Sequence, residues 1–464
     1  MNERVKFTLT EEDIPYTWLN IAPDLGGVPP ILDPATGEPV SRAELCRSIA
    51  EPLVDQELSE EPEFEIPGPV RDIYRQWRPT PLYRARRLER ALDTPAHIYY
   101  KYEGTSPAGS LKPNSAIPQA YYNKQVGKTG LITETGAGQW GTSIASAAAM
   151  FGLTAKIFMV GVSYRQKPYR RALMEAYGAV CASSPSLETE VGRAILAEDP
   201  DHPGSLGIAK AEALEVAFSH PELGYNRGSS LNHVCTHQTV VGQEAMLQME
   251  LADDYPDIVV APCGGGSTLA GLSFPFLRNK LRGGRDIRLI AAEPVACPTL
   301  TRGRIAYDHS DSARLTPLSR MYTLGHKFVP PPVHAGGLRA HDVSPLLTRA
   351  FEAGLMEAVA LRQNAVFEAG LLFAREEGIL PAPESAHAVR AAIDEALRCR
   401  AEGRTQTILI GLSGHGYLDL GAYEMYRNGS LPDDSPSEEE LERGLASIPA
   451  LAREFSAPSQ AAVR

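Results

Sequence analysis

Residues 130–143 read GLITETGAGQWGTS, and this stretch decides the fold class. Its first six residues form an apolar, β-branched run that is typical of a buried strand. A glycine-rich loop follows, and the small residues of SIASAAAMFG then continue as a helix-like stretch. A strand that passes through a glycine loop into a helix is the first half of a βαβ unit. The segment therefore predicts a parallel sheet with helices packed against it.

The same alternation continues along most of the chain. Strand-like runs and helical stretches follow one another, among them the runs HIYYKYE, AKIFMV, DIVVAP, IRLIAAE and TILIGL and the stretches KPYRRALMEAYG and VGQEAMLQMELA. This pattern favours parallel sheets built from βαβ units. We therefore predict an α/β protein of two interlocked domains with mostly parallel sheets. The N-terminal domain is expected at residues 74–238 and the C-terminal domain at residues 239–428.

The two ends of the chain differ from this central part. Residues 1–73 are rich in proline, glycine and acidic residues, and they predict an extension that wraps the core, with one short helix near SRAELCRSIAEPL. Residues 429–464 form an acidic tail that is interrupted by prolines. Within this tail, Ser437 precedes three glutamates and has the pattern of a helix N-cap with acids that complement the helix dipole. We interpret it as the start of a solvated surface helix.

The composition narrows the functional class. The 464 residues contain 45 Lys+Arg and 57 Asp+Glu, a net charge of −12, which disfavours a partner such as nucleic acid or an anionic membrane. No stretch approaches the roughly 18 apolar residues of a membrane span, and the first residues lack the apolar run of a signal peptide. The six cysteines contain no CxxC pair. We expect a cytoplasmic protein with no membrane partner.

Binding sites of open α/β sheets lie at the carboxyl ends of the strands, and three glycine-rich loops follow predicted strands. In the first loop, Gly136, Gly138 and Gly141 match the GxGxxG pattern of a dinucleotide site. The next strand, however, runs into Gly161-Val162-Ser163 without the acidic residue that would bind the ribose. What remains is a row of backbone N–H groups that suits any anion, including a carboxylate. A structural turn, or a nicotinamide-dependent oxidoreductase, stays open as an alternative.

The second loop, in DIVVAPCGGGSTLAG, predicts a phosphate site. Three consecutive glycines, 264–266, precede Ser267 and Thr268 between a predicted strand and a predicted helix. Such a run of flexible backbone with hydroxyl side chains makes a good nest for phosphate. The loop lacks the GK[ST] ending of a nucleotide P-loop. The expected ligand is therefore a phosphate group but not a nucleoside triphosphate.

The third loop places Ser413 after a strand in GLSGHG. A serine-hydrolase elbow requires GxSxG, and His415 stands where the last glycine should be, so a hydrolase is not favoured. Ser413 remains a donor to a ligand or a cap of the next helix. His233 and His237 have i, i+4 spacing but lack the glutamate of a zinc motif, and we interpret them as structural. No metal site is predicted from them.

Lys112, in EGTSPAGSLKPNSAIPQ, is the fourth candidate. It stands between Leu111 and Pro113 after a strand and a proline-glycine turn. Apolar neighbours lower the pKa of a lysine amine and favour Schiff-base chemistry. Taken alone, Lys112 would be read as an ordinary surface lysine. Together with a separate phosphate nest, it matches the two requirements of pyridoxal phosphate, an aldehyde-trapping amine and a phosphate cradle.

These residues lead to a family. The sequence resembles the β chain of tryptophan synthase, within the fold type II pyridoxal-phosphate enzymes, and is most similar to its long "β-chain-like" branch. That branch has an extended N-terminus and works without the α subunit. The matching segments run in order from about residue 74 to residue 420. They are RPTPLYRARRLE, YYKYEGTSPAGSLKPNSA, TETGAGQWGTS, QKPYRRALMEAYGA, PCGGGSTLAG, HAGGLR, EGILPAPESAHA and GLSGHGYLD.

The resemblance implies a role for each candidate residue around pyridoxal 5'-phosphate. Lys112 would form the internal aldimine and move the Cα proton. Asn114 would bind the phenolic oxygen of the cofactor and Ser413 its pyridine nitrogen, and Glu384 would lie beside the cofactor. The phosphate would be held by Gly264, Gly265, Gly266, Ser267 and Thr268.

The resemblance also implies the substrates, L-serine and indole. Glu134 would protonate the leaving hydroxyl and then direct indole through its N–H, so that serine passes through an aminoacrylate to L-tryptophan and water. The enzyme would then be a carbon–oxygen lyase that works as a homodimer without an α subunit, with a monovalent cation, K+ or Na+. The amino-acid substrate would be bound by Thr135, Gly136, Ala137, Gly138, Gln139 and Trp140.

Several positions depart from the family pattern. Leu111 replaces the usual histidine before the lysine, Thr268 replaces an asparagine, and Pro113 and Ser115 flank Asn114. These departures keep open a β-replacement with another donor, such as O-phosphoserine, or with a modified indole acceptor. A binding module without catalysis is disfavoured because Lys112, Glu134 and Ser413 are all present.

Overall fold

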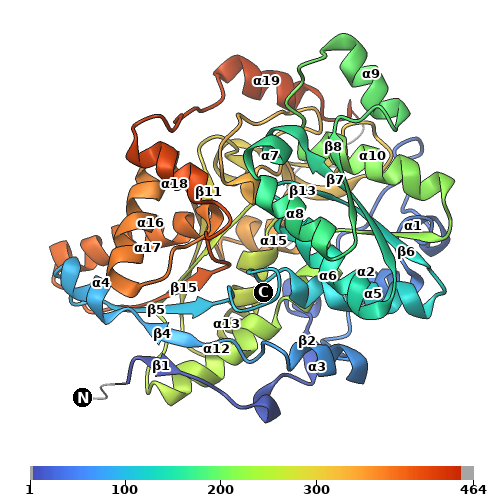
Figure 1. Cartoon of the computed structure of the whole chain (residues 1–464). Helices are drawn as coiled ribbons and strands as arrows, with labels where there is room; N and C mark the ends of the chain where they lie inside the picture. The colour runs from blue at the N-terminus through green and yellow to red at the C-terminus, as the bar shows by residue number, and fades with distance from the viewer. Residues whose placement is uncertain (1–3, 451–464) are drawn as a thin grey trace.

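The computed structural model describes residues 4–450, and its larger sheet has seven strands (Figure 1). The five strands from β5 to β14 are parallel, whereas β1 and β4 are antiparallel to their neighbours. In spatial order the strands are β1 (Lys6–Phe7), β4 (Leu82–Arg84), β5 (His97–Tyr102), β15 (Thr407–Leu412), β10 (Ile258–Pro262), β11 (Arg288–Pro294) and β14 (Glu357–Leu361).

Helices cover both faces of this sheet. Alternate residues of β10 point to opposite faces, as the pleat of a strand requires. Ile258 and Val260 belong to a core shared with α16 (Gln363–Glu377) and α17 (Pro383–Glu402), whereas Val259 packs with α12 and α13. Because both faces are buried, the central strands are apolar almost without interruption. The helices of the second face are α12 (Val240–Leu251) and α13 (Ser267–Leu281).

The smaller sheet has four parallel strands. Their spatial order is β8 (Val180–Ser184), β7 (Thr154–Val160), β6 (Gly130–Thr135) and β9 (Leu223–Asn226). The helices around it are α5 (Pro113–Gln125), α6 (Gln139–Phe151), α7 (Gly161–Gln166), α8 (Pro168–Ala176), α9 (Glu190–Glu198) and α10 (Leu206–Ser219).

The division of the sheets does not follow the predicted boundary at residue 238. β4 and β5, which the sequence assigns to the N-terminal domain, belong to the larger sheet, where β5 pairs with β15. The chain starts the larger sheet, leaves it to build the smaller one, and returns to complete the larger one. This path confirms the α/β class with interlocked, mostly parallel sheets. The domain boundary at residue 238 stays a prediction, and the pairing of β5 with β15 was not foreseen, because a strand run does not reveal its pairing partner.

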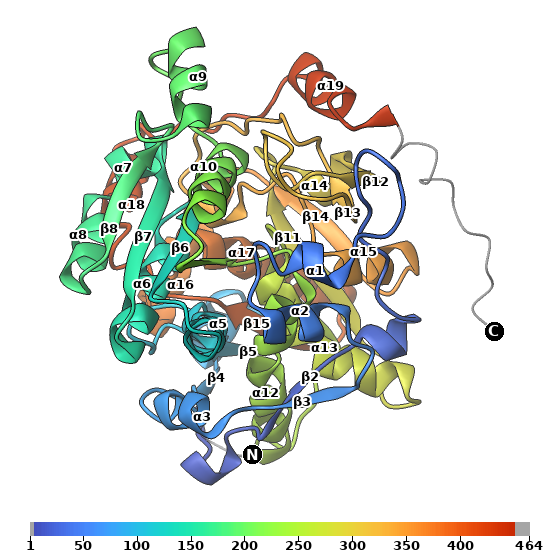
Figure 2. The same ribbon diagram turned by 90° about the vertical axis from the view of Figure 1, so that its right-hand side faces the viewer.

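The N-terminal segment forms short elements that lie along the outside of the core (Figure 2). β2 (Thr17–Leu19) pairs antiparallel with β3 (Glu63–Glu65). The helix expected near SRAELCRSIAEPL is divided into α1 (Arg42–Leu45) and α2 (Glu51–Leu58), and α3 (Gly68–Tyr74) follows. α2 packs against α5 and against α11 (Asn232–His237).

The remaining elements belong to the C-terminal half. Ser437 caps α19 (Glu438–Ala446), since its hydroxyl accepts from the Glu440 N–H at 3.2 Å, which confirms the predicted N-cap. Within residues 4–450, no helix combines the length and apolar character needed to span a membrane. The other elements are α14 (Thr299–Arg302), the hairpin β12 (Arg304–Asp308) and β13 (Ser319–Thr323), α15 (Pro345–Glu352) and α18 (Leu420–Arg427).

Candidate active site

The carboxyl ends of four parallel strands meet between the two sheets. The loops after β5, β6, β10 and β15 carry Lys112, Glu134 to Gln139, the 264–266 glycines and Ser413, which is the edge where α/β proteins bind ligands. Two adjoining cavities open there. The carboxylate-loop cavity contains Glu134, Thr135, Gly136, Ala137 and Trp140, and the phosphate-loop cavity contains Gly264 to Thr268, Glu384 and Ser413. Both cavities are lined by Lys112, Gln139, Ser229 and Gly337.

Lys112 stands at the boundary of these cavities, at the N-terminal end of α5. Its Nζ donates to the Gly228 carbonyl and to the Ser267 hydroxyl, both at 2.7 Å. Burial lowers the pKa of the amine to about 8, because the charged form loses hydration there. This confirms the lowered pKa expected from the apolar neighbours. An amine of this pKa is partly neutral near physiological pH, which nucleophilic attack on an aldehyde requires.

The phosphate loop has a shape that only glycine permits. Gly266 has φ +102° and directly precedes α13. A Cβ there would lie 2.1 Å from a Leu347 methyl, and a Cβ at Gly264 would lie 2.7 Å from the Gly337 carbonyl oxygen. The backbone can therefore approach a ligand closely, and the start of α13 favours negative charge. Glycine amides together with the Ser267 hydroxyl fit a phosphate monoester.

Ser413 lines the phosphate-loop cavity together with residues 264–268. Its Oγ is 2.7 Å from the Oγ of Ser385, and the Ser385 hydroxyl in turn accepts from the Gly414 N–H at 3.1 Å. The pair is neutral and oriented by the backbone, which suits a hydrogen bond to a pyridine nitrogen. Ser385 was missed in the sequence, although it directly follows the highlighted Glu384.

Glu384 connects three parts of the site. Its Oε1 accepts from the Gly337 N–H at 2.9 Å, and its Oε2 accepts from the Gln139 side chain at 3.2 Å. Glu384 also opens α17 and is buried. The carboxylate therefore links the start of α17 to the HAGGLR segment and to the carboxylate loop.

The backbone N–H groups of the carboxylate loop, residues 135–139, and of the helix start after it fall into two groups. The Thr135 hydroxyl accepts from the N–H groups of Gly138 at 3.2 Å and Gly141 at 3.1 Å. Gly138 has φ +95° and does not line either cavity, so its role in this structure is conformational, and its contact with the substrate stays a prediction. Within the described part of the chain, the N–H groups of Ala137 and Gln139 have no acceptor, so they are available to a substrate carboxylate.

Glu134 ends β6 beside this loop and is 4% exposed. Burial raises the pKa of its carboxyl group, while Lys210 and Arg227 act in the opposite direction. The Tyr225 hydroxyl donates to its Oε2 at 2.9 Å. Sequence reasoning missed Tyr225 because β9 is a four-residue strand, LGYN, without an apolar run. Its register places Tyr225 opposite Ile132 of β6.

Trp140 forms a wall of the carboxylate-loop cavity. Its indole N–H donates to the Thr133 hydroxyl at 2.7 Å, which fixes the ring. A Cβ at Gly228 would lie 2.6 Å from that ring, so the two segments pack closely. Leu206, at the start of α10, lines the same cavity.

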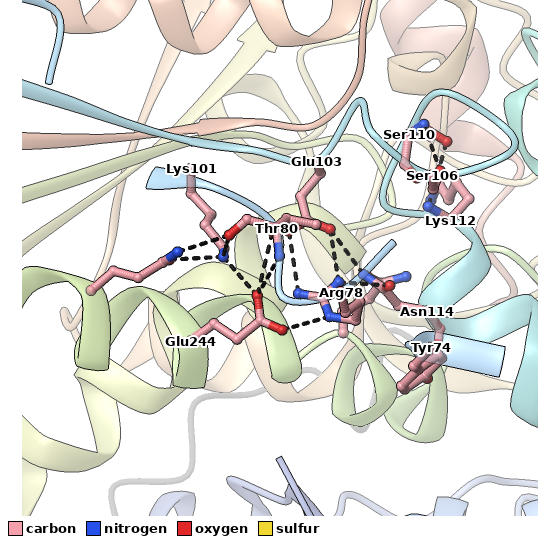
Figure 3. A network of polar contacts seen from close by, with 12 residues as sticks. Tyr74, Arg78, Thr80, Lys101, Glu103, Ser106, Ser110, Lys112, Asn114 and Glu244 are labelled. Atoms are coloured by element: carbon pink, nitrogen blue, oxygen red, sulfur yellow. Dashed lines mark hydrogen bonds and ion pairs between the residues drawn. The ribbon is translucent and has the colours of Figure 1, made fainter. Parts of the chain in front are cut away.

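Asn114, which the resemblance places at the cofactor, has its side chain in a buried polar network (Figure 3). Its Oδ1 accepts from Arg78 at 2.8 Å, and its Nδ2 donates to Glu103 at 3.2 Å and to Gln238 at 3.1 Å. Both amide hydrogens are thus used, and Asn114 lines neither cavity. The side chain is thus committed to the network in this structure, and the expected contact with the phenolic oxygen stays a prediction.

Four buried charges make up the rest of this network. Arg78 bridges Glu103 at 3.0 Å and Glu244 at 2.8 Å, and Lys101 donates to Glu244 at 2.7 Å. Two cations and two anions balance each other, which is the condition for keeping charges in the interior. The network forms a polar floor beneath the first turn of α5, directly after Lys112 (Figure 3).

Arg339, in the HAGGLR segment, is a buried cation that sequence reasoning did not single out. Its Nη2 donates to the Ser163 hydroxyl at 2.8 Å, and its Nε has no partner in residues 4–450. Burial lowers the pKa of its guanidinium to about 10. Arg339 lines a small space next to the carboxylate-loop cavity, and Gly136 and Leu206 line both.

His233 and His237 are held by structural contacts, in line with their interpretation from the sequence. His233 pairs with Glu57 at 2.7 Å, and His237 lies against Trp18. Over residues 4–450, no group of three or more His, Cys, Asp or Glu side chains is arranged to hold a metal ion.

The chain is similar to known proteins along nearly its whole length. Residues 73–414 match the family of pyridoxal-phosphate dependent enzymes. The tryptophan synthase beta chain 2 of Aquifex aeolicus is 55% identical, over 92% of this chain and 100% of that protein. The proteins of the same name from Aeropyrum pernix and Thermotoga maritima are each 54% identical, over 94% and 90% of this chain and 98% and 100% of theirs.

A solved structure supports the fold. A fungal L-serine ammonia-lyase from Rhizomucor miehei superimposes with a TM-score of 0.55 at 17% identity, over 75% of this chain and 97% of that one. The family match also removes the nicotinamide-dependent oxidoreductase as an interpretation of the GAGQWG loop.

Proposed function

Because the chain belongs to the tryptophan synthase beta chain family of pyridoxal-phosphate dependent enzymes, we propose that it replaces the β-hydroxyl of L-serine with indole, which gives L-tryptophan and water. The observation that carries this proposal is the position of Glu134. It is a buried carboxyl group with a raised pKa in the cavity that Lys112 also lines. A carboxyl group that burial shifts toward its protonated form, in the same cavity as a reactive lysine, suits the loss of a poor leaving group.

Lys112, the 264–266 glycines, Ser267 and Ser413 would hold pyridoxal 5'-phosphate. The bound cofactor supplies an electron-withdrawing ring that makes the substrate Cα proton acidic and allows the β-substituent to leave. The Lys112 amine would accept the Cα proton and later return it. A neutral Ser413 leaves the ring nitrogen unprotonated, which favours elimination and replacement over transamination.

The carboxylate loop would bind the amino-acid substrate. The N–H groups of Ala137 and Gln139, which have no acceptor in the described part of the chain, would bind the substrate carboxylate at the start of α6. The helix dipole favours a negative charge there. Glu134 would donate a proton to the departing hydroxyl and would then accept a hydrogen bond from the indole N–H. Trp140 and Leu206 provide apolar surface for a flat aromatic acceptor.

Arg339 favours a second donor, O-phosphoserine. A buried guanidinium whose Nε has no partner, and which pairs with no carboxylate among residues 4–450, suits a dianionic leaving group. Leu111, which lines the phosphate-loop cavity, contributes no charge there, whereas Arg339 is a buried cation next to the carboxylate loop. A modified indole remains an alternative acceptor.

The assay compares the two donors directly. The holoenzyme is incubated with indole and either L-serine or O-phosphoserine, and tryptophan is quantified by chromatography. A higher kcat/KM with L-serine supports the first donor. Loss of O-phosphoserine turnover in Arg339→Met, with L-serine turnover retained, supports the second. The absence of tryptophan with both donors contradicts the proposal.

The assembly and location of the enzyme extend this proposal. We propose a cytoplasmic homodimer that works without an α subunit and is activated by K+ or Na+. Sedimentation of the purified protein tests the dimer, and replacement of the alkali cation with tetramethylammonium tests the ion requirement. Full turnover in tetramethylammonium would contradict the ion requirement.

A further inference from the structure

Glu57 is a buried carboxylate outside the residues assigned to catalysis. It lies on α2 of the N-terminal segment and is 2% exposed. Its Oε1 accepts from the Asn232 N–H at 3.0 Å. Its Oε2 accepts from the His233 N–H at 3.0 Å and lies 2.7 Å from Nδ1 of the His233 ring. Because a buried carboxylate is costly without donors, this is a specific contact between α2 and the first turn of α11.

Gln56, the preceding residue, holds the other end of α11. Its Oε1 lies 2.8 Å from Nε2 of His237, and its Nε2 donates to the Tyr122 hydroxyl of α5 at 3.1 Å. The ring of Trp18, on β2, lies 4.4 Å from the His237 ring, measured between centroids. Two elements of the N-terminal segment therefore fix α11 at both ends.

The residues just before α11 belong to the active site. We call residues 228–230 the anchored segment. The Gly228 carbonyl accepts from Lys112, and a Cβ at Gly228 would meet the Trp140 ring. On the other side, a Cβ at Gly265 would lie 2.4 and 2.5 Å from hydroxyls of this segment. The segment thus fills the space between the carboxylate loop and the phosphate loop, and its position affects both.

The backbone of the anchored segment needs support. Ser230 has φ +68°, the left-handed region that non-glycine residues rarely adopt. Such a conformation persists only when its surroundings hold it. Its own side chain contributes a single long contact, 3.5 Å to the Asp342 carbonyl. The donors that follow two and three residues later, at Asn232 and His233, are the ones held by Glu57.

We propose that α2 is a clip that positions the active site, with Glu57 and Gln56 as positioning residues that act through α11 and the anchored segment on Lys112. The N-terminal segment would then belong to the support of the site. This inference rests on the proposed role of Lys112 as the residue that binds the cofactor.

Amide hydrogen exchange of the cofactor-free protein tests the clip. Glu57→Gln keeps the shape of the side chain but removes its charge, and it turns one acceptor into a donor that faces the His233 N–H. We expect exchange in peptides covering residues 228–237 to become about tenfold to hundredfold faster, the range for losing hydrogen bonds to a charged acceptor. Exchange over β10 should stay at the wild-type rate. Equal acceleration in β10 would indicate global loosening and would overturn a local clip.

Cofactor affinity provides the second readout. Titration of the visible absorbance of the bound cofactor should give a dissociation constant about tenfold higher in Glu57→Gln, because the Gly228 carbonyl no longer holds Lys112 in place. Gln56→Ala, which leaves the charge intact, should show a smaller increase in the same direction. An unchanged dissociation constant in both variants would overturn the proposal.

Asp55→Asn is the matched control. Asp55 lies on the same helix, is exposed, and pairs with Arg42 on the surface. It should match the wild type in exchange and in cofactor affinity, and an effect as large as that of Glu57→Gln would overturn the proposal. Neither readout uses tryptophan formation. A wild-type protein that binds cofactor but makes no tryptophan would therefore refute the proposed function and leave the clip to be judged by exchange and affinity.

Discussion

The two glycine loops of the active site, the carboxylate loop with Gly138 and the phosphate loop with Gly266, have similar backbone arrangements but different side chains packed near them. Each follows a parallel strand, and Gly138 and Gly266 each have positive φ directly before a helix. Behind the phosphate loop lie apolar side chains such as Leu347. Beside the carboxylate loop lie Glu134, whose pKa is raised by burial, and the Tyr225 hydroxyl that donates to it. Under the proposed function, the same backbone turn would be used once to hold a permanent anion and once to bring an anionic substrate to a proton donor.

The largest expected effect comes from the residue that both cavities share. Lys112→Ala should reduce kcat by about 10⁴-fold or more, because it removes both the covalent attachment and the group that moves the Cα proton. The measurement is tryptophan formation by the holoenzyme, with Lys128→Ala as a surface lysine control. Retained activity would show that the two loops are not coupled through this amine.

Glu134→Gln should separate the two loops. We expect kcat to fall by about 10²- to 10³-fold, because the amide cannot donate the proton that the leaving group needs. Cofactor affinity should remain unchanged, since Glu134 lines only the carboxylate-loop cavity. Absorbance titration together with steady-state kinetics checks both parts. A variant that also lost its cofactor would contradict the division of roles.

Replacement of Gly266 or Gly138, the two positive-φ glycines of these loops, by alanine should weaken the binding of different ligands. Each change introduces strain of about 1–3 kcal/mol, equivalent to tenfold to hundredfold in binding. Gly266→Ala, which meets Leu347, should raise the dissociation constant of the cofactor. Gly138→Ala, which meets the Cβ of Arg170, should raise KM for L-serine. The opposite pattern of effects would contradict the assignment of the cofactor to the phosphate loop and of L-serine to the carboxylate loop. Gly178→Ala, also at positive φ but with open space around it, controls for strain alone.

Tyr225→Phe should have the smallest effect. The lost hydrogen bond to Glu134 is worth about 0.5–1.5 kcal/mol, so kcat should change by only twofold to tenfold. Because this bond stabilises the charged carboxylate, its loss raises the pKa of Glu134 further. Glu134 acts in its protonated form, so activity falls as pH rises through that pKa. In the variant this fall should occur at higher pH, and a shift to lower pH would contradict the assignment.

The sequence predicts best what is contiguous in the chain. Lys112 and residues 264–268 stand in short motifs whose chemistry depends on local order, and the structure brings both to the same cavity. Glu384 and Ser413 likewise follow from one segment each. Their burial and pairing partners come from elsewhere in the fold.

Contacts that depend on distant partners were not predicted. Asn114 is expected at the cofactor, but the hydrogen bond that its side chain accepts from Arg78, which lies well upstream in the sequence, was not foreseen. Tyr225 reaches Glu134 only because β9 pairs with β6. Glu57 contacts α11 across most of the N-terminal half of the chain. A single sequence contains no signal for such pairings, because each side chain taken alone has an ordinary surface interpretation.

The pairing of β5 with β15 has a consequence for folding during synthesis of the chain. β5 is made early during synthesis, but its parallel partner is among the last strands to be made. β4 is available to one edge of β5 from the start, but at roughly 5–20 residues per second the edge that pairs with β15 stays without its partner for tens of seconds. Lys112 follows the first of these strands and Ser413 the second. Both ends of the proposed cofactor pocket are therefore present only on nearly complete chains, and we expect incomplete chains to bind the cofactor poorly.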